Sequence, residues 1–212
     1  MRAGPDADRA PGRPYAAPMT DAQIPWSTGT WTTPPRWART EGDAFVVAPV
    51  GGSDAWVETA YGFTHDDAHG LLAPLADPGA VEVTFSIDGP LAQFDQAGLM
   101  LRVDPRTWIK AGVEMSDGVL QVGAVVTLGR SDWSVRPVPA WAGRRVTIRA
   151  SHDGEAVTLR ARVDDEPFEL LRVAPFVAGE IGTGPFCAAP TQEGVEVRFH
   201  SWRTGPADAA LH

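Results

Sequence analysis

The stretch FDQAGLMLRVDPRTWIKAGVEMSDGVLQVGAVVT, residues 94–127, decides the fold. It holds three apolar-rich segments of strand length, separated by the turn signals Asp104-Pro105-Arg106 and Asp117-Gly118. Asp-Gly is a preferred pair for a two-residue hairpin turn, and Asp with Pro also favours a turn. The stretch therefore predicts an antiparallel meander of three strands.

The two turns also predict the register of the meander. A two-residue loop at Asp117-Gly118 places Ser116 opposite Val119. In the first hairpin, a three-residue loop over 104–106 places the inward-facing residues of its two strands opposite each other. On the outward face these registers align three glycines, one from each strand: Gly98, Gly112 and Gly123.

The glycine row is interpreted as the floor of a groove, because a glycine inside a strand commonly marks the close approach of a ligand or another backbone. Polar and large side chains should stand around the row. On one side these are Met100, Lys110 and Val125, then Arg102, Trp108 and Thr127, and on the other side Gln96, Glu114 and Gln121. The alternative is a solvated sheet face whose glycines accommodate a bulky neighbouring side chain.

Alternation of apolar and polar residues recurs along the rest of the chain, and no 12-residue window has helical periodicity. Four further segments place apolar residues on one face: 80–88, 145–150, 156–163 and 194–202. Short strands between turn clusters indicate an antiparallel sandwich. We expect one all-β domain over residues 23–204, a disordered tail over 1–22 and a frayed tail over 205–212.

Composition excludes several classes of function. The 212 residues include 27 acidic and 18 basic side chains, and the net charge of -9 argues against binding nucleic acid or an anionic membrane. The single cysteine, Cys187, is expected to be a small core residue, and its isolation favours a reducing compartment, the cytoplasm. The chain has no apolar run long enough to span a bilayer and no signal-peptide pattern at its start. The sequence does not indicate an oligomeric state.

A second ligand-binding candidate follows the meander at Ser131-Asp132-Trp133-Ser134. In a loop, Asp132 would accept hydrogen bonds and Trp133 would stack on a sugar ring; the alternative is a turn above an aromatic plug. Upstream, strand alternation would place Trp56, Glu58 and Ala60 on one face, which makes Glu58 a possible second carboxylate of the groove.

Histidines and acids cluster in His65-Asp66-Asp67-Ala68-His69. His65, Asp66 and His69 could hold zinc or manganese, but Asp and His also collect in ordinary turns. We expect neither a metal nor a cofactor. His152 and His200 are isolated and are expected at the surface.

The sequence lacks the common catalytic signatures, including G-x-S-x-G, the Walker loop, H-E-x-x-H and the dinucleotide fingerprint. Glu114 is the candidate general acid or base. Spacing does not indicate a partner for it, although Glu58, Asp95 or Asp132 could serve.

Four segments together resemble the regulation-of-enolase-like family, a domain of unknown function found in bacteria and fungi. They are AYGF (60–63), DQAGLM (95–100), WIKAGVE (108–114) and SDWS (131–134), and the resemblance runs from about Trp26 to Trp202. It implies a concanavalin A-like jelly-roll sandwich of two antiparallel sheets, one of them concave. The chain lacks the E-x-D-x-x-E strand motif of the related glucanases.

The favoured hypothesis is a domain that binds a carbohydrate or other small polar ligand on the concave sheet. The alternatives are a saccharide-active enzyme that uses Glu114, and a protein-interaction module that regulates a metabolic enzyme. Lys110 is the one lysine beside 17 arginines. We therefore expect Lys110→Arg to impair function while the fold stays intact, because a compact ammonium and a planar guanidinium differ in geometry.

Overall fold

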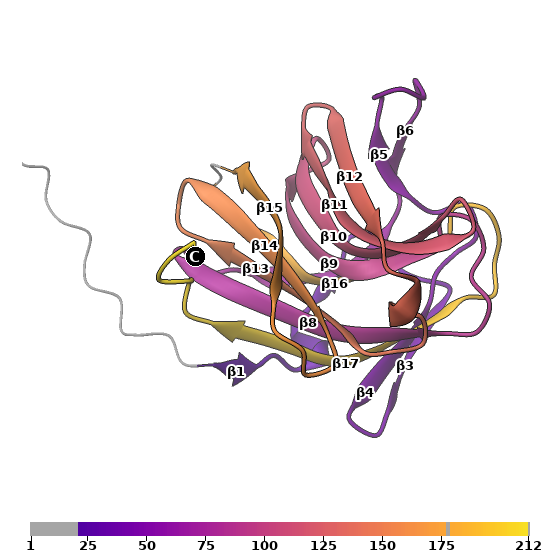
Figure 1. The fold of residues 1–212 in the computed structure, drawn as a ribbon, viewed down its shortest axis with the longest axis horizontal. Helices are drawn as coiled ribbons and strands as arrows, with labels where there is room; N and C mark the ends of the chain where they lie inside the picture. The colour runs from indigo at the N-terminus through magenta and orange to yellow at the C-terminus, as the bar shows by residue number, and fades with distance from the viewer. Residues whose placement is uncertain (1–20, 177–178, 212) are drawn as a thin grey trace, which may run out of the picture.

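The computed structural model describes residues 21–176 and 179–211, so residues 1–20 of the tail expected over 1–22 lie outside the described part. The described chain is a jelly-roll sandwich of two large antiparallel sheets (Figure 1). Its strands are β1 Ala22–Gln23, β2 Thr30–Trp31, β3 Trp37–Glu41, β4 Ala44–Ala48, β5 Ala55–Val57, β6 Thr64–Asp66, β7 His69–Pro74, β8 Gly79–Asp88, β9 Gln96–Asp104, β10 Thr107–Ser116, β11 Val119–Leu128, β12 Ser131–Pro137, β13 Val146–His152, β14 Ala156–Val163, β15 Glu169–Pro175, β16 Gly182–Ala188 and β17 Glu196–Gly205. Two short 3-10 turns, η1 Trp26–Thr28 and η2 Pro139–Trp141, complete the set.

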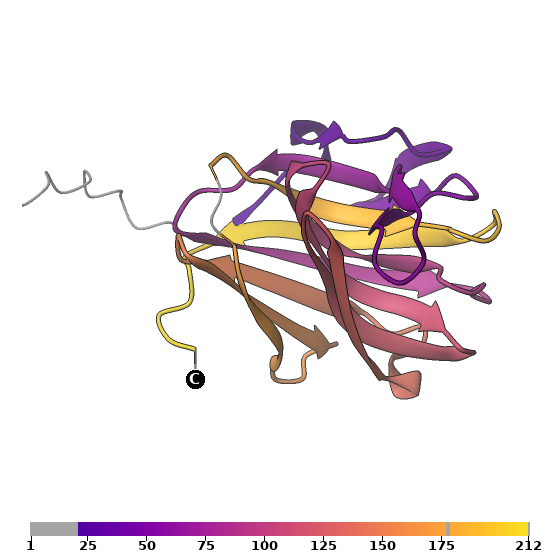
Figure 2. The ribbon, with the colours of Figure 1, turned by 90° about the horizontal axis from the view of Figure 1, so that it is seen from above.

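The strands form two layers, which Figure 2 shows from above. One sheet runs in the order β15-β14-β13-β8-β17-β4-β3, with β1 paired to β17. The other runs β12-β11-β10-β9-β16-β7-β2, and β5 pairs only with β6 in a separate hairpin. The strands β9–β12 therefore form four of the seven strands of the second sheet, and we call the second sheet the meander sheet.

The register predicted for the meander is confirmed. Ser116 pairs with Val119 across the Asp117-Gly118 turn, and Leu101 pairs with Ile109 across the first turn. As a result Gly112 pairs with both Gly98 and Gly123. Turn chemistry was sufficient for the second hairpin because a two-residue loop leaves no freedom in the pairing. In the first hairpin the matching of inward faces gave the register from Trp108 onward, while at the turn itself Thr107 pairs with Asp104 and the register shifts between Thr107 and Trp108.

The core lies between the two sheets and is built from the inward residues of both. The segments expected to alternate supply it with Val83, Phe85, Ile148, Leu159 and Phe199, each no more than 2% exposed. Cys187 also lies there, fully buried, as expected of a small core residue. Because every second residue of these strands is apolar, one face of each sheet is withdrawn from water.

The glycine row has a steric cause within the sheet. An added Cβ at Gly98 would lie 2.0 Å from the carbonyl oxygen of Ala111, and one at Gly112 would lie 2.0 Å from that of Ala97. The strands approach each other too closely in this row for any side chain. Phe186 pairs with Gly98 from the adjacent strand β16. At the Gly98 end of the row, the glycine therefore lies beside a bulky neighbouring side chain, as the alternative interpretation expected, and does not form the floor of an open groove.

The outer face of the meander sheet carries a second, smaller apolar cluster. The β5–β6 hairpin, at the upper right of Figure 1, contributes Trp56 and Val57 to it. The sheet contributes Met100, Trp108, Val125 and Phe186. This outer cluster attaches the hairpin to the sheet and so places the hairpin side chains beside the polar residues of β9 and β10.

Both ends of the described chain differ from the expected boundaries. Ala22 and Gln23 form β1 and pair with Thr204 and Arg203 of β17. After β17 the chain stays against the sheet, because the Asp208 carboxylate forms ion pairs with Arg149 and Arg160. The segment 205–212 was expected to fray, but Gly205 ends β17 and Asp208 attaches the residues after it through a charged cluster.

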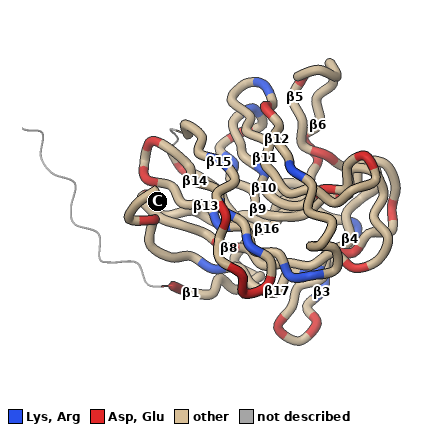
Figure 3. Tube along the Cα trace, viewed as in Figure 1, with Lys and Arg blue, Asp and Glu red and all other residues tan. Residues whose placement is uncertain are grey.

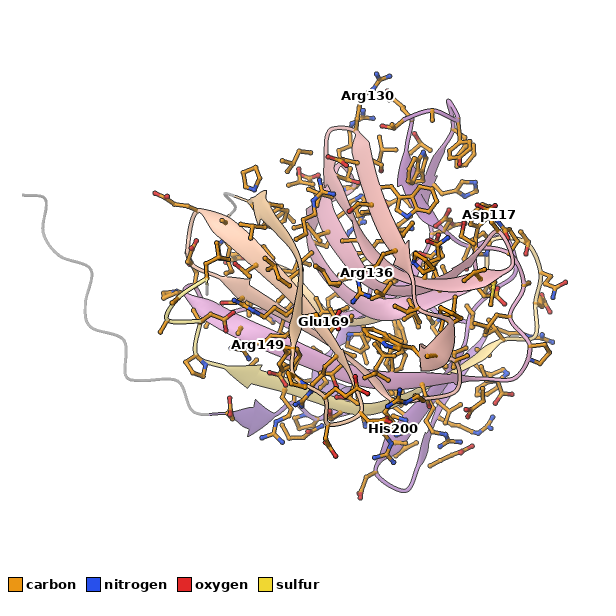
Figure 4. All side chains as sticks on the ribbon, viewed as in Figure 1. Asp117, Arg130, Arg136, Arg149, Glu169 and His200 are labelled. Carbon is orange, nitrogen blue, oxygen red and sulfur yellow. The ribbon has the colours of Figure 1, made fainter. Side chains whose placement is uncertain are left out.

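Charges are distributed over the sheets and turns with acidic and basic segments interleaved (Figure 3). One cross-sheet example is the ion pair of Arg136 on β12 with Glu169 on β15, labelled side by side in Figure 4. No helix among the described residues is long and apolar enough to cross a membrane.

Candidate functional site

A cavity lies between the β5–β6 hairpin and the outer face of the meander sheet, and we call it the hairpin pocket. Its volume is about 430 Å³, within the range of about 300–1,000 Å³ that is usual for small-molecule sites. The residues that line it are Gly52, Asp54, Trp56, Tyr61, Phe63, His65, Phe94, Gln96, Lys110, Glu114, Val125, Trp133, Pro190 and Thr191.

A buried ion pair forms part of the polar lining. Lys110 on β10 reaches across to Asp54, which directly precedes β5, with 2.9 Å between Nζ and Oδ1. The two side chains are only 5% and 17% exposed. Gln96 donates to the same Oδ1 at 3.2 Å, and the Ala55 backbone N–H donates to it at 2.7 Å. Lys110 thus holds the base of the hairpin to the sheet.

Glu114 lies on the same face of β10 as Lys110 and lines the same pocket. Its Oε1 is buried and accepts no hydrogen bond from any group in residues 21–176 and 179–211. Burial raises the pKa of Glu114 to about 7; the nearby charge of Lys110 lowers it, and the charge of Asp54 raises it further. Glu114 can therefore change its protonation state near neutral pH.

Aromatic rings line the hairpin side of the pocket as one connected series. The Trp56 ring meets the rings of Tyr61 and Trp133 edge to face, with centroids 5.6 and 6.5 Å apart. Phe63 stacks on Tyr61 and meets His65 edge to face. Tyr61 and Phe63 are 57% and 44% exposed, which is unusual for such large rings unless the surface has a binding role.

The pocket thus combines flat apolar surfaces with a few fixed polar groups. Such a combination is typical of small-molecule sites, where rings provide contact area and polar groups orient the ligand. An indole or phenol ring can pack against the apolar face of a sugar, while Gln96, Asp54 and Glu114 can exchange hydrogen bonds with its hydroxyls.

Four of the residues expected to bind ligand line this pocket: Gln96, Lys110, Glu114 and Trp133. Two others, Trp108 and Met100, are at most 1% exposed and belong to the outer cluster. Trp108 was expected to stand beside the glycine row and bind ligand, but its ring lies under the hairpin and its Nε1 donates to the Pro105 carbonyl.

The remaining expected residues are occupied elsewhere. Arg102 forms a two-bond ion pair with Asp66 of β6, and Gln121 donates weakly to the Ser116 carbonyl. Asp132 pairs with Arg172 of the other sheet, because Ser131–Pro137 is strand β12 rather than a loop. Alternation along β12 gives Asp132 and Trp133 opposite faces.

The possible partners of Glu114 lie outside the pocket. Glu58 was expected on a strand beside Trp56, but its φ is 58°, so it sits in the hairpin turn and pairs with Arg106 and Arg130. Asp95 is buried, and its Oδ2 accepts from the Ala92 N–H. Asp54 is the second carboxylate of the pocket.

The expected histidine cluster is divided among separate roles. His65 lines the pocket, Asp66 binds Arg102, and His69 is buried, where its Nε2 accepts from the Val50 N–H. No group of three metal-ligating side chains occurs in the described ranges. His152 was expected at the surface but is fully buried against Phe176, where its Nε2 donates to the Phe176 carbonyl; His200 is half-buried beside Ser86.

Sequence reasoning missed Asp54 and the aromatic turn of the hairpin. Trp56, Tyr61 and Phe63 occur within eight residues (56–63), and such a density of rings in a turn is a usable signal. Asp54 has no local signal, because its role follows from the hairpin folding back over β10.

Comparison with known proteins places this architecture in a family. The family model described as "Protein of unknown function (DUF1349)" matches residues 31–207. In sequence, the chain is 34% identical over 190 residues to the Saccharomyces cerevisiae protein named Regulation of enolase protein 1, covering 88% of this chain and 94% of that protein.

Solved structures agree with the fold. A crystal structure of a functionally unknown protein from Saccharomyces cerevisiae has a TM-score of 0.82 at 29% identity, covering 88% of this chain and all of that one. A xylan beta-1,4-xylosidase from Bacillus halodurans has a TM-score of 0.64 at 13% identity, covering 93% of this chain and 41% of that one. The second likeness concerns the fold alone.

Proposed function

This chain belongs to the DUF1349 family, whose function is unknown, and we propose that it binds a carbohydrate or similar small polar ligand in the hairpin pocket. The proposal rests on one observation: the same cavity is lined by exposed aromatic rings and by largely buried polar side chains. A group of exposed aromatic rings indicates a surface that a ligand covers. Polar groups in the same cavity orient that ligand.

The pocket shape favours this ligand class over a protein partner. A docking surface for a protein is expected to be broad, with a buried area of about 800 Å² on each side. Here the exposed rings of Tyr61 and Phe63 line one cavity of about 430 Å³. Regulation of a metabolic enzyme, suggested by the name of the yeast relative, remains a weaker alternative, which enrichment of one specific partner in a pull-down would favour.

Tyr61→Ala tests the binding proposal without disturbing the core. We expect the affinity for cellobiose, measured by isothermal titration calorimetry, to fall about three- to tenfold, because a stacked aromatic contact contributes about 0.5–1.5 kcal/mol beyond the area it buries. The melting temperature should change little, since Tyr61 is 57% exposed. Phe168→Ala, a half-buried ring outside the pocket, is the control for loss of an aromatic side chain. Equal affinities in Tyr61→Ala and wild type would contradict a role for the hairpin rings.

A second candidate function is catalysis on a saccharide. It is favoured by two carboxylates that line one pocket in different surroundings: Asp54 accepts three hydrogen bonds at Oδ1, whereas the Glu114 Oε1 accepts none from the residues that the structure describes. Such a difference is how enzymes separate an acid from a base or charge stabiliser. Turnover of a polysaccharide library that Glu114→Gln abolishes would support this candidate, and absence of turnover would leave binding as the function.

A further inference from the structure

The charges in the hairpin pocket do not balance. The titratable groups that line it are Asp54, Tyr61, His65, Lys110 and Glu114. Lys110 and Asp54 are 2.9 Å apart and neutralise each other. When Glu114 ionises, no second lysine or arginine among the described residues that line the pocket is left to pair with it.

Glu114 also has an oxygen ready to accept a hydrogen bond. Its Oε1 is shielded from bulk water and unpaired within the described residues. A buried carboxylate is stable only with donors or a counter-charge, and without them it takes up a proton. The pKa of about 7, raised mainly by burial, is that response. A donor with positive charge would satisfy both needs.

We infer that the ligand of the hairpin pocket carries a protonated amino group, as in an amino sugar, and that this group pairs with the Glu114 carboxylate. The inference rests on the proposed binding function and specifies the ligand class. The aromatic wall suits the same chemistry, because ring faces attract ammonium groups within about 6 Å of their centroids. Lys110 already makes such a contact, with its Nζ 6.0 Å from the Trp108 ring.

The alternative ligand is a neutral saccharide to which protonated Glu114 donates. The two ligand classes differ in their effect on the proton of the Glu114 carboxyl group. An ammonium group stabilises the carboxylate, lowers its pKa and releases the proton, so affinity rises as the pH increases towards about 7. A neutral hydroxyl or carbonyl acceptor keeps the proton in place, and its affinity falls over the same range.

The test compares cellobiose with the disaccharide of glucosamine, in which amino groups replace the two C2 hydroxyls. Isothermal titration at pH 6.5, in two buffers with different ionisation enthalpies, gives both the affinity and the number of protons released. Because a hydrogen bond to a charged group is worth about 1.5–3 kcal/mol, we expect the amino disaccharide to bind at least tenfold tighter, with proton release. Cellobiose should release none.

Glu114→Gln is expected to reduce the preference for the amino disaccharide over cellobiose to less than about threefold and to abolish proton release. Glu166→Gln is the matched control, because Glu166 is an exposed carboxylate paired with Arg144 away from the pocket. The wild-type comparison remains decisive even if Glu114→Gln does not fold. Equal affinities, tighter binding of cellobiose, or amine binding without proton release would overturn the inference. Failure of both disaccharides to bind would instead count against the proposed function.

Discussion

Lys110→Met is expected to destabilise the protein by about 3–5 kcal/mol and to abolish ligand binding. The substitution removes one partner of a buried ion pair and leaves the Asp54 carboxylate, 17% exposed, without its counter-charge. The remaining partner is then buried and uncompensated, which is why breaking such a pair is costly. Urea unfolding followed by tryptophan fluorescence measures the change. Asp54 also anchors the first strand of the hairpin, so the pocket should open when the pair is lost.

The pair offers its own controls. Lys110→Met combined with Asp54→Asn removes both charges and should recover most of the lost free energy. Arg36→Met breaks an exposed pair in which both side chains are 55% exposed, and it should cost no more than about 1 kcal/mol. If Lys110→Met is as stable as Arg36→Met, the Lys110–Asp54 pair does not hold the hairpin.

Lys110→Arg keeps the charge but enlarges the side chain. The sequence predicted loss of function with an intact fold. Because Lys110 is only 5% exposed, the larger guanidinium has little room, and overpacking typically costs about 1–3 kcal/mol. We now expect loss of function accompanied by a measurable loss of stability.

Trp56→Ala should have the second-largest effect, with a loss of about 3–5 kcal/mol, as is usual for truncating a large buried ring. Trp56 is 7% exposed and belongs to the outer cluster, and its ring contacts both Tyr61 and Trp133. Its removal should detach the hairpin and eliminate the pocket. Chemical unfolding and titration with cellobiose measure the two consequences.

Trp37→Ala is the control for loss of a tryptophan. Trp37 is half-buried on edge strand β3, where Arg39 covers its ring at 4.1 Å. This variant should lose markedly less stability and retain cellobiose binding. If the β5–β6 hairpin of Trp56→Ala stays protected from hydrogen exchange, the outer cluster does not attach the hairpin to the sheet.

The fold was predictable because its determinants are local. Alternation at 80–88 and 156–163 identified strands and their buried faces, and Asp117-Gly118 fixed the register to the residue. The SDWS segment was assigned to a loop because its strand pattern is short and polar. It forms β12 at the sheet edge, where one face stays exposed and apolar residues are not required.

The site was predictable only in part, because it combines distant segments. Lys110 and Glu114 were identified from the meander, which supplies one side of the pocket. The other side comes from the β5–β6 hairpin, and no pairing between that hairpin and a sheet reveals its position. Trp108 was misplaced for the same reason: without the hairpin, its face of the sheet appears open to solvent.

We propose above all that the hairpin pocket binds a saccharide. The most direct test is a titration of ¹⁵N-labelled protein with cellobiose and the glucosamine disaccharide, observed through the indole N–H signals of its eight tryptophans. We predict saturable shifts for Trp56 and Trp133, which line the pocket, and little change for Trp202 in the core. Saturable shifts confined to other tryptophans, or no shifts with either disaccharide, would contradict the claim.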